Sequence, residues 1–214
     1  TQKILLRGQS LEAGVDPELL LQKYPTQEVL GSNNDWQQDS RHPEIPDYLK
    51  PLNATDAALL RDLSADGYYT VQLSSKGANA LGLLEVITVP QTPTSATKLF
   101  NISTRALVQG GAYDIIAGFI IEGEGLQKVV IRGTAVDTGV DPVLIVQELG
   151  KTEVMAQNDN WLDDPRASEI PAHLQLNKKT DAALLLSLPK GAYTVILTSL
   201  GAKKLGLIEV VAVD

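Results

Sequence analysis

Short apolar runs recur along the chain, and each is bounded by Gly, Pro or Asp. In the C-terminal half these runs are "KVVIRGTA" (128–135), "PVLIVQEL" (142–149), "AYTVILTSL" (192–200) and "LGLIEVVAV" (205–213). They are rich in Val, Ile, Leu and Thr, which favour a pleated and partly buried backbone. The pattern therefore predicts β-strands.

Two further runs, "NISTRALV" (101–108) and "DIIAGFIIEG" (114–123), predict two more strands in the same half of the chain. The run "DAALLLSL" (181–188) has the composition of a helical turn, but "LPKGAYTV" (188–195) follows it at once. We expect a strand, a turn and a second strand there. Several short strands at this spacing predict an antiparallel β-sandwich.

The strand pattern occurs twice, because the sequence overlays itself when it is shifted by 125 residues. One residue is deleted in the second copy after the "TDAALL" match, and the order of matching segments is preserved throughout. The matched pairs are "KILLRG" (3–8) with "KVVIRG" (128–133), "GVDPELLLQ" (14–22) with "GVDPVLIVQ" (139–147), "TDAALL" (55–60) with "TDAALL" (180–185), "GYYTVQLSS" (67–75) with "GAYTVILTS" (191–199), and "LGLLEV" (81–86) with "LGLIEV" (205–210). The chain therefore contains a duplication.

The two copies are unequal in length. Residues 98–127 precede the second copy and have no counterpart before Lys3, while "VPQTPTSAT" (89–97) has the composition of a linker. We therefore expect an all-β protein of two tandem antiparallel, jelly-roll-like β-sandwich domains. Residues 98–214 form the complete repeat, and residues 1–88 form a repeat that lacks its opening strands.

Five motifs carry a resemblance to a known family. In chain order they are "NISTR", "GFII", "KVVIR", "QNDNW" and "KGAYT". Together they resemble a β-sandwich repeat of large exported bacterial proteins, and the architecture is similar to the jelly-roll modules appended to secreted peptidases. The resemblance implies a surface or accessory domain without enzymatic activity, placed outside the cell or on its surface. Modules of the second kind often bind calcium.

Composition and charge narrow the function classes further. The formal charge of −8 at pH 7 argues against a nucleic-acid partner, which usually meets a basic face, and it suits a protein that binds cations. The chain has no cysteine, which excludes disulfides, thiol catalysis and zinc–thiolate sites. No apolar run approaches the roughly 20 residues of a membrane helix, so we expect no membrane insertion.

An acidic, amide-rich cluster stands beside each of the two tryptophans, in "SNNDWQQD" (32–39) and "QNDNWLDD" (157–164). Calcium takes six to eight oxygen ligands from carboxylates, amides and carbonyls. Asp56 and Asp181, which start the two "DAALL" segments, are candidate remote ligands. The candidate metal ligands are Asn33, Asp35, Asp39, Asp56, Asn158, Asp159, Asn160, Asp164 and Asp181.

A structural turn is the alternative to calcium binding, since Asn and Asp are the usual residues of turns and the spacing does not match an EF-hand. Trp36 and Trp161 likewise have two interpretations. They are either buried indoles that cap one end of a core or platforms on which a sugar stacks. Both alternatives stay open at this point.

No catalytic constellation emerges from the motifs. His42 aligns with Ala167 and His173 aligns with Tyr48, so neither histidine recurs in the other copy. Arg7 and Arg132 do recur, and we expect each to pair with a carboxylate at the sandwich edge, in Asp16 and Asp141. We therefore expect a protein that is not an enzyme.

A sandwich that lacks its first two strands exposes its core and an unpaired edge, which favours strand addition. Either the chain is a fragment of a longer array, or another subunit supplies the absent strands. Donation that does not close builds a filament. Because residues 98–127 serve their own repeat, a donor would come from swapping of that segment, from the linker or from a terminus.

The functional expectation is a non-enzymatic extracellular structural or adhesive module, stabilised by calcium and assembling into a filament or surface layer. Its expected partners are other copies of itself or neighbouring repeats. The alternative is a carbohydrate-binding accessory module of a secreted protein, which binds glycans through Trp36 and Trp161.

Overall fold

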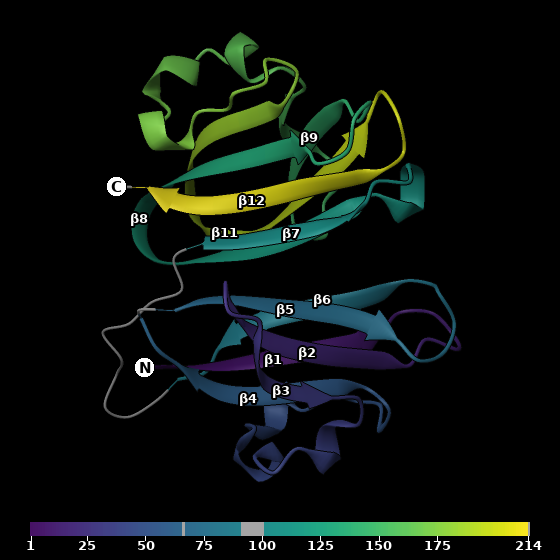
Figure 1. Cartoon of the computed structure of the whole chain (residues 1–214). Helices are drawn as coiled ribbons and strands as arrows, with labels where there is room; N and C mark the ends of the chain where they lie inside the picture. Colours follow the sequence, from purple (N-terminus) through teal and green to yellow (C-terminus); the bar gives the residue numbers. More distant parts are fainter. Residues whose placement is uncertain (66, 91–100, 214) are drawn as a thin grey trace. The chain divides into compact units, whose positions relative to one another are not determined.

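The computed structural model describes residues 1–65, 67–90 and 101–213, and within these residues it contains strands and short 3-10 helices but no α-helix. All strand pairings are antiparallel, so the predicted all-β class is confirmed (Figure 1). The chain divides into two compact units, Thr1–Leu99 (unit 1) and Phe100–Asp214 (unit 2). The described part of the chain has no helix long and apolar enough to cross a bilayer. Most of the predicted linker, residues 91–97, lies outside the described residues.

Unit 1 consists of two three-stranded sheets, with strand orders β4-β1-β6 and β3-β2-β5. Three 3-10 helices lie between β3 and β4. The strands are β1 (Gln2–Ser10), β2 (Pro17–Tyr24), β3 (Glu28–Asn33), β4 (Ala57–Leu63), β5 (Tyr68–Ser75) and β6 (Gly82–Thr88), and the helices are η1 (Trp36–Gln38), η2 (His42–Glu44) and η3 (Asp47–Leu49).

The central strand β1 is buried on both of its faces. Ile4 and Leu6 point into one core cluster with Leu19 and Leu21 of the other sheet. Leu5 points the opposite way, into a second cluster that contains Trp36 of η1. Successive side chains of a strand alternate between the two faces of a sheet, so burial of both faces explains the unbroken apolar run "ILL" (4–6) at the centre of β1.

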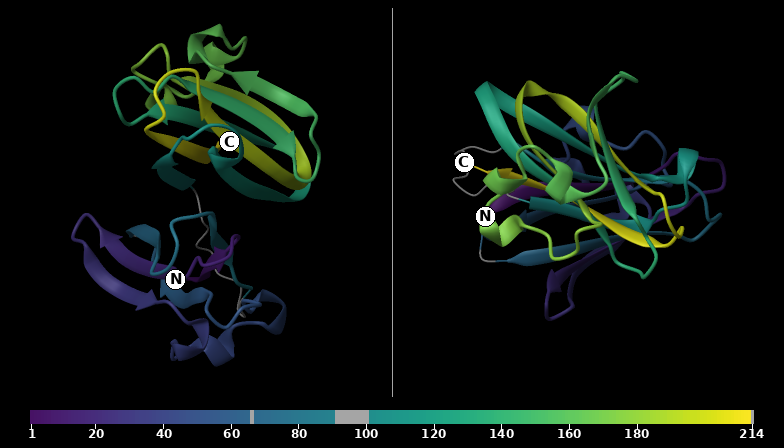
Figure 2. Two further views of the ribbon diagram at one scale, coloured as in Figure 1. Left: turned by 90° about the vertical axis from the view of Figure 1, so that its right-hand side faces the viewer. Right: turned by 90° about the horizontal axis from the view of Figure 1, so that it is seen from above.

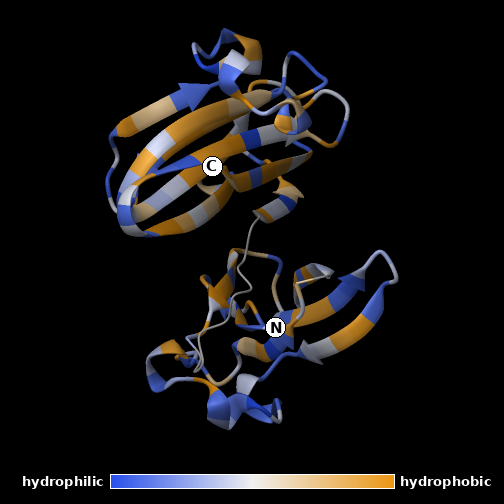
Figure 3. Ribbon diagram, turned by 90° about the vertical axis from the view of Figure 1, so that its left-hand side faces the viewer, coloured by the Kyte–Doolittle hydropathy of each residue, from blue (hydrophilic) through white to orange (hydrophobic). Residues whose placement is uncertain are grey.

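Unit 2 contains one six-stranded sheet among the described residues, in the order β10-β9-β11-β8-β12-β7. Hydrophobic residues concentrate in its strands, while the loops between β10 and β11 are mainly hydrophilic (Figure 3). The elements are β7 (Asn101–Leu107), η4 (Gly111–Tyr113), β8 (Ile115–Ala135), β9 (Pro142–Glu148), β10 (Val154–Asn158), η5 (Trp161–Asp163), η6 (Ala167–Glu169), η7 (Ala172–Leu174), β11 (Ala182–Ser199) and β12 (Leu205–Val213).

The long strands β8 and β11 join the two layers of unit 2. Residues 126–133 of β8 pair with the first half of β11, and residues 115–121 pair with its second half. The ribbon of β8 bends between these halves, where Gly123 and Gly125 have φ angles of 98° and 87° (Figures 1 and 2). Such left-handed backbone favours glycine.

The strands predicted for "DAALLLSL" and "LPKGAYTV" are confirmed in unit 2, but the turn between them is wrong, because β11 continues through this segment with one irregularity between Pro189 and Gly191. "DIIAGFIIEG" and "KVVIRGTA" likewise belong to the single strand β8. Strands β8 and β11 pair with each other over nearly their whole length, so their hydrogen bonding continues around the bend. In unit 1 the corresponding strands β4 and β5 are separate.

The sheets of the two units correspond strand by strand. The order β4-β1-β6 matches the first half of β11, the second half of β8, and β12, while β3-β2-β5 matches β10, β9 and the second half of β11. The registers agree as well, since Leu6 faces Leu59 and Ile131 faces Leu184. Strand β7 and the first half of β8 have no counterpart in the described part of unit 1. As a result β6 and β5 are edge strands there, one in each sheet.

Candidate functional site

The predicted asparagine ligands tie the tryptophan loops to a strand edge in both units. Asn33 ends β3, its Nδ2 donates to the carbonyl oxygen of Asp35 at 2.8 Å, and its Oδ1 accepts from the backbone N–H of Ala58 at 2.9 Å. Asn158 repeats this with the carbonyl oxygen of Asn160 at 2.9 Å and the N–H of Ala183 at 3.0 Å. Both Asn side chains are buried.

The predicted remote ligands Asp56 and Asp181 are also buried, and each accepts a hydrogen bond from a neighbouring strand. The N–H of Ser10 donates to Asp56 Oδ1, and the N–H of Ala135 donates to Asp181 Oδ1, both at 3.0 Å. Asn53 Nδ2 also donates to Asp56 Oδ2 at 3.2 Å. These carboxylates satisfy backbone donors where the strand pairing ends.

Asp39 and Asp164 occupy matching positions, but among the described residues only Asp39 accepts hydrogen bonds from an arginine side chain. Arg61 binds Asp39 through two N–H groups, at 2.8 and 3.2 Å, and the N–H of Arg41 donates to the same carboxylate at 3.0 Å. Asp164 accepts from the N–H of Arg166 at 2.7 Å. Unit 2 has Leu186 where unit 1 has Arg61, so the bidentate ion pair belongs to unit 1 alone.

The remaining predicted ligands do not complete a metal site. Asp35 Oδ2 accepts from Gln38 Nε2 at 2.7 Å, and no hydrogen bond is seen for the side chains of Asp159 and Asn160. Among the described residues, no group of three or more His, Asp or Glu side chains converges in a way that would hold a metal ion. Each buried ligand already accepts at least one hydrogen bond through a side-chain oxygen. This arrangement favours the structural turn, and calcium binding stays a prediction.

Both indoles lie in hydrophobic cores. The exposed fractions of Trp36 and Trp161 are 9% and 8%, and each packs in a cluster with an isoleucine of the following loop, Ile45 or Ile170. Their Nε1 atoms are buried without a hydrogen-bond partner in the described residues. Because so little ring surface is exposed, this burial weighs against sugar stacking and agrees with core caps.

Removal of the Asn33 side chain is expected to destabilise unit 1. In Asn33→Ala the buried N–H of Ala58 loses its acceptor, which costs about 1–3 kcal/mol of unfolding free energy. Denaturant unfolding followed by tryptophan fluorescence measures the loss, and hydrogen exchange at the Ala58 amide locates it. The matched control is Asn34→Ala, since the Asn34 side chain makes no hydrogen bond with the described residues. Equal stability of the two variants contradicts the structural role.

The exposed loop charges pair locally. Arg41 donates to Glu44 at 2.8 and 2.9 Å and to Asp62 at 2.9 Å, and these contacts join η2 to β4. The hydrogen bonds from Arg41 lower the pKa of Glu44 to about 2, against a smaller opposing effect of desolvation. In unit 2, Arg166 lowers the pKa of Glu169 in the same way. These carboxylates are half exposed, so solvent screening keeps their contribution to stability small.

The partners expected for Arg7 and Arg132 are wrong. Arg7 pairs with Glu85, directly opposite on β6, with Nε to Oε2 at 2.8 Å, and it also donates to the carbonyl oxygen of Leu49. Arg132 pairs with Glu209, directly opposite on β12, through Nη2, while its buried Nε has no hydrogen-bond partner among the described residues. The glutamates that recur in "LGLLEV" and "LGLIEV" are the sequence feature that could have identified these partners. Pairing with Asp16 or Asp141 would have required a different strand order.

The edge strands β5 and β6 expose part of the unit 1 core. Tyr69, Val71 and Leu73 of β5 and Leu84 of β6 are only half-buried. Their counterparts in unit 2, listed in the same order, have exposed fractions of 4% for Tyr193, 0% for Val195, 0% for Leu197 and 1% for Ile208. The difference arises from the opening segment of unit 2, whose Val108, Ile115, Phe119 and Ile121 pack in that core.

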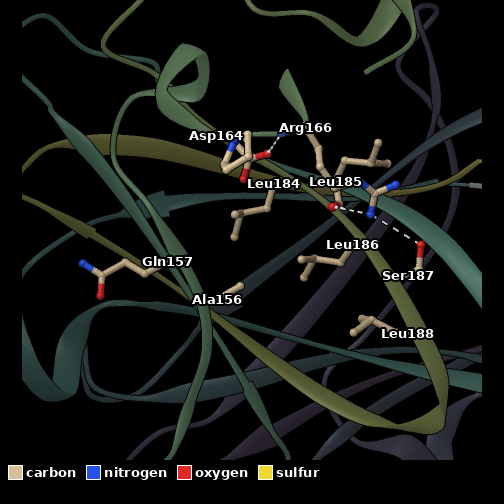
Figure 4. Close-up of a pocket in the computed structure, with 10 residues that line it drawn as sticks. Ala156, Gln157, Asp164, Arg166, Leu184, Leu185, Leu186, Ser187 and Leu188 are labelled. Atoms are coloured by element: carbon tan, nitrogen blue, oxygen red, sulfur yellow. Dashed lines mark hydrogen bonds between the residues drawn. The ribbon is translucent and has the colours of Figure 1, made fainter. Parts of the chain in front are cut away.

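Other edges of the sheets carry features that hinder strand addition. The pairing of β3 with β2 contains a bulge, as does that of β10 with β9. Arg61 Nη1 covers the carbonyl oxygen of Leu60 on β4 at 2.8 Å. In unit 2, Arg166 crosses a hollow beside β11 and donates to the carbonyl oxygen of Leu185 at 3.1 Å (Figure 4). Bulges and charged side chains are recognised devices against edge pairing.

Strands β5 and β6 have neither device. Their pairings with β2 and β1 run without a register shift. Neither strand contains Pro, Lys or Arg, and Glu85, the single charged residue of the two, is paired with Arg7. The two regular edges and the half-buried core between them form the candidate functional site, which we call the open face of unit 1.

Comparisons with known proteins give little further information. No protein-family model matches the sequence, and no curated protein matches it. Among solved structures, the chain is similar to the VP2 subviral particle of infectious bursal disease virus, with 10% sequence identity and a TM-score of 0.22. The alignment covers 99% of this chain and 56% of that one. At this TM-score the likeness carries no argument about fold or function.

Proposed function

We propose that this chain is a non-enzymatic structural or adhesive module of an exported bacterial protein, acting outside the cell or on its surface. It associates with other copies of itself or with neighbouring repeats through strand addition at the open face of unit 1. The observation that supports this most is the contrast between two regular, unprotected edges in unit 1 and the same edges covered by β7 and β8 in unit 2.

The physical basis is the free energy of the exposed core. Half-buried Val71, Leu73 and Leu84 gain apolar burial when strands cover them. Main-chain hydrogen bonds along β5 and β6 add affinity, as in other complexes formed by strand addition. If the donor and acceptor faces of successive copies do not close into a ring, repeated addition builds a filament or a surface layer.

The carbohydrate-binding alternative has less support. It requires an exposed ring face beside hydrogen-bonding groups, whereas Trp36 and Trp161 are buried. The loops that hold these tryptophans are explained by the asparagine and aspartate contacts with neighbouring strands. We therefore assign these loops a role in folding, and a glycan partner stays a secondary prediction.

The test is the solution mass, measured by light scattering over a range of concentrations, once in calcium and once in chelator. We expect the mass to rise above that of a single chain, 23.0 kDa, as the concentration increases. Particles that form in calcium and not in chelator would support the calcium prediction as well. A constant mass of 23.0 kDa in both conditions would overturn the assembly role.

A further inference from the structure

We infer that the open face of unit 1 binds the opening segment of another repeat, a two-stranded peptide with the pattern of residues 101–121. Its first strand adds to β6, its second strand adds to β5, and a branched apolar side chain between them enters a notch at Gly82. The inference rests on the proposed function for its biological meaning and names the partner of that site.

The register of the bound segment follows from unit 2. There β7 pairs with β12 so that Ala106 faces Gly206, Thr104 faces Ile208 and Ile102 faces Val210. The corresponding residues of β6 are Gly82, Leu84 and Val86, which the repeat places at the same positions. A donor strand of this pattern therefore faces Gly82 with a small residue and Leu84 with a threonine.

The second strand is defined in the same way. In unit 2 the first half of β8 places Phe119 opposite Tyr193, Ala117 opposite Val195 and Ile115 opposite Leu197. The rings of Phe119 and Tyr193 are stacked, with centroids 5.3 Å apart and planes inclined by 24°. The matching residues of β5 are Tyr69, Val71 and Leu73.

A hydrogen bond of its hydroxyl group anchors the ring of Tyr69 at the position where such a contact would form. Its hydroxyl group donates to the carbonyl oxygen of Ser64 at 3.3 Å, much as the hydroxyl group of Tyr193 donates to that of Pro189 at 2.8 Å. The ring of Tyr69 is half-buried and that of Tyr193 is buried. The inferred site therefore offers an anchored aromatic ring to an incoming phenylalanine.

Gly82 provides the most specific evidence. A Cβ atom on its counterpart Gly206 would lie 2.8 Å from Val108 Cγ2 and 3.0 Å from Leu197 Cδ2, so a glycine there makes room for both of these fully buried side chains. A Cβ atom on Gly82 would meet Leu73 Cδ2 at 3.3 Å and the carbonyl oxygen of Gln9 at 3.4 Å. Gly82 is exposed, and its φ angle is outside the left-handed region. A Cβ atom here would press on Leu73, a half-buried side chain that has room to shift, and an incoming valine would add a second reason for a glycine at this position.

The direct test uses a fluorescent peptide with the sequence of residues 101–121, extended by lysines for solubility, and the full chain. We expect saturable binding by fluorescence anisotropy, with hydrogen-exchange protection appearing in β5 and β6. Gly82→Val fills the notch and is expected to weaken binding by about tenfold or more. The same peptide with Val108→Asp should lose affinity similarly, because the charge would enter an apolar notch. Thr70→Val alters the exposed side of β5 and should bind as the unchanged chain does.

A cross-linking experiment checks the register independently, since the chain has no cysteine. The protein variant Leu83→Cys should form a disulfide with a peptide that carries Arg105→Cys, the residue opposite its counterpart Leu207. A peptide that carries Ile102→Cys should cross-link much less. Equal cross-linking of both peptides, or unchanged affinity in a folded Gly82→Val variant, would overturn the inference.

The failures of the two proposals are distinguishable. Peptide binding by a chain that stays at 23.0 kDa would leave this site in place and remove the assembly role. Particles that form equally well in Gly82→Val would leave assembly in place and remove this site.

Discussion

Fusion of residues 98–127 directly ahead of Lys3 is expected to raise the unfolding free energy of unit 1 by about 2–4 kcal/mol. The fusion restores the order in which this segment precedes "KVVIRG" in the second copy. It covers the half-buried Val71, Leu73 and Leu84 and adds the apolar side chains of the segment itself. Full burial of one such side chain is worth about 1.5–3 kcal/mol, and the entropy of ordering the added strands offsets part of the sum.

Denaturant unfolding measures this gain, and hydrogen exchange in β5 and β6 shows whether it arises at the open face. The matched control is the same fusion with aspartate at the positions of Val108 and Phe119, which keeps the added length and removes the apolar contacts. The completed chain should also lose the concentration-dependent rise in mass, because its open face is occupied. A fusion no more stable than its aspartate control would contradict the view that unit 1 lacks these strands.

Much of the fold was predictable because the order of apolar and polar side chains along each strand reflects which of its faces are buried. The apolar run "ILL" (4–6) is unbroken since both faces of β1 are covered, and the duplication gave a second example of the strands from "KILLRG" onward. Gly, Pro and Asp marked several of the chain reversals. The all-β class follows from these local signals, which do not depend on knowing the strand order.

The features that were missed depend on contacts between distant residues. Asn33 and Ala58 are 25 residues apart, and nothing in "SNNDWQQD" indicates that the side-chain amide of Asn33 connects the loop to β4 by a hydrogen bond. The Arg7–Glu85 pair depends on β1 and β6 being neighbours in one sheet. The continuity of β11 through Pro189 depends on a partner, β8, that bends with it. Local composition carries no information about these partners. It therefore could not distinguish a ligand cluster from a structural turn.

The sequence shows that residues 98–127 have no counterpart within residues 1–88, but the structural consequence depends on the strand order. A shorter repeat predicts an exposed core and an unpaired edge. The structure shows that β7 and the first half of β8 belong to opposite layers of unit 2, so their absence opens one edge in each sheet of unit 1. A segment that covers both edges as residues 101–121 do in unit 2 therefore contributes two strands and the connection between them, which is a more selective requirement than one added strand.

The comparison of Leu197→Ala with Leu73→Ala separates a closed core from an open one. Leu197 is fully buried, and its methyl groups fill the space left by Gly133 and Gly206. Its truncation is expected to cost about 2–5 kcal/mol, because a cavity remains among residues that cannot collapse. Leu73 lies against Gly8 in the same manner but is half-buried, so its truncation should cost roughly 1–2 kcal/mol.

Unfolding curves of the two variants, each assigned to its unit by hydrogen exchange, provide the measurement. In the fused chain, Leu73→Ala should become as costly as Leu197→Ala, since the added segment closes the core around Leu73. Because both substitutions replace leucine by alanine, the difference between their costs in unfolding free energy measures the difference in burial. Equal costs in the unfused chain would mean that unit 1 already encloses Leu73, and the open face would lose its energetic basis.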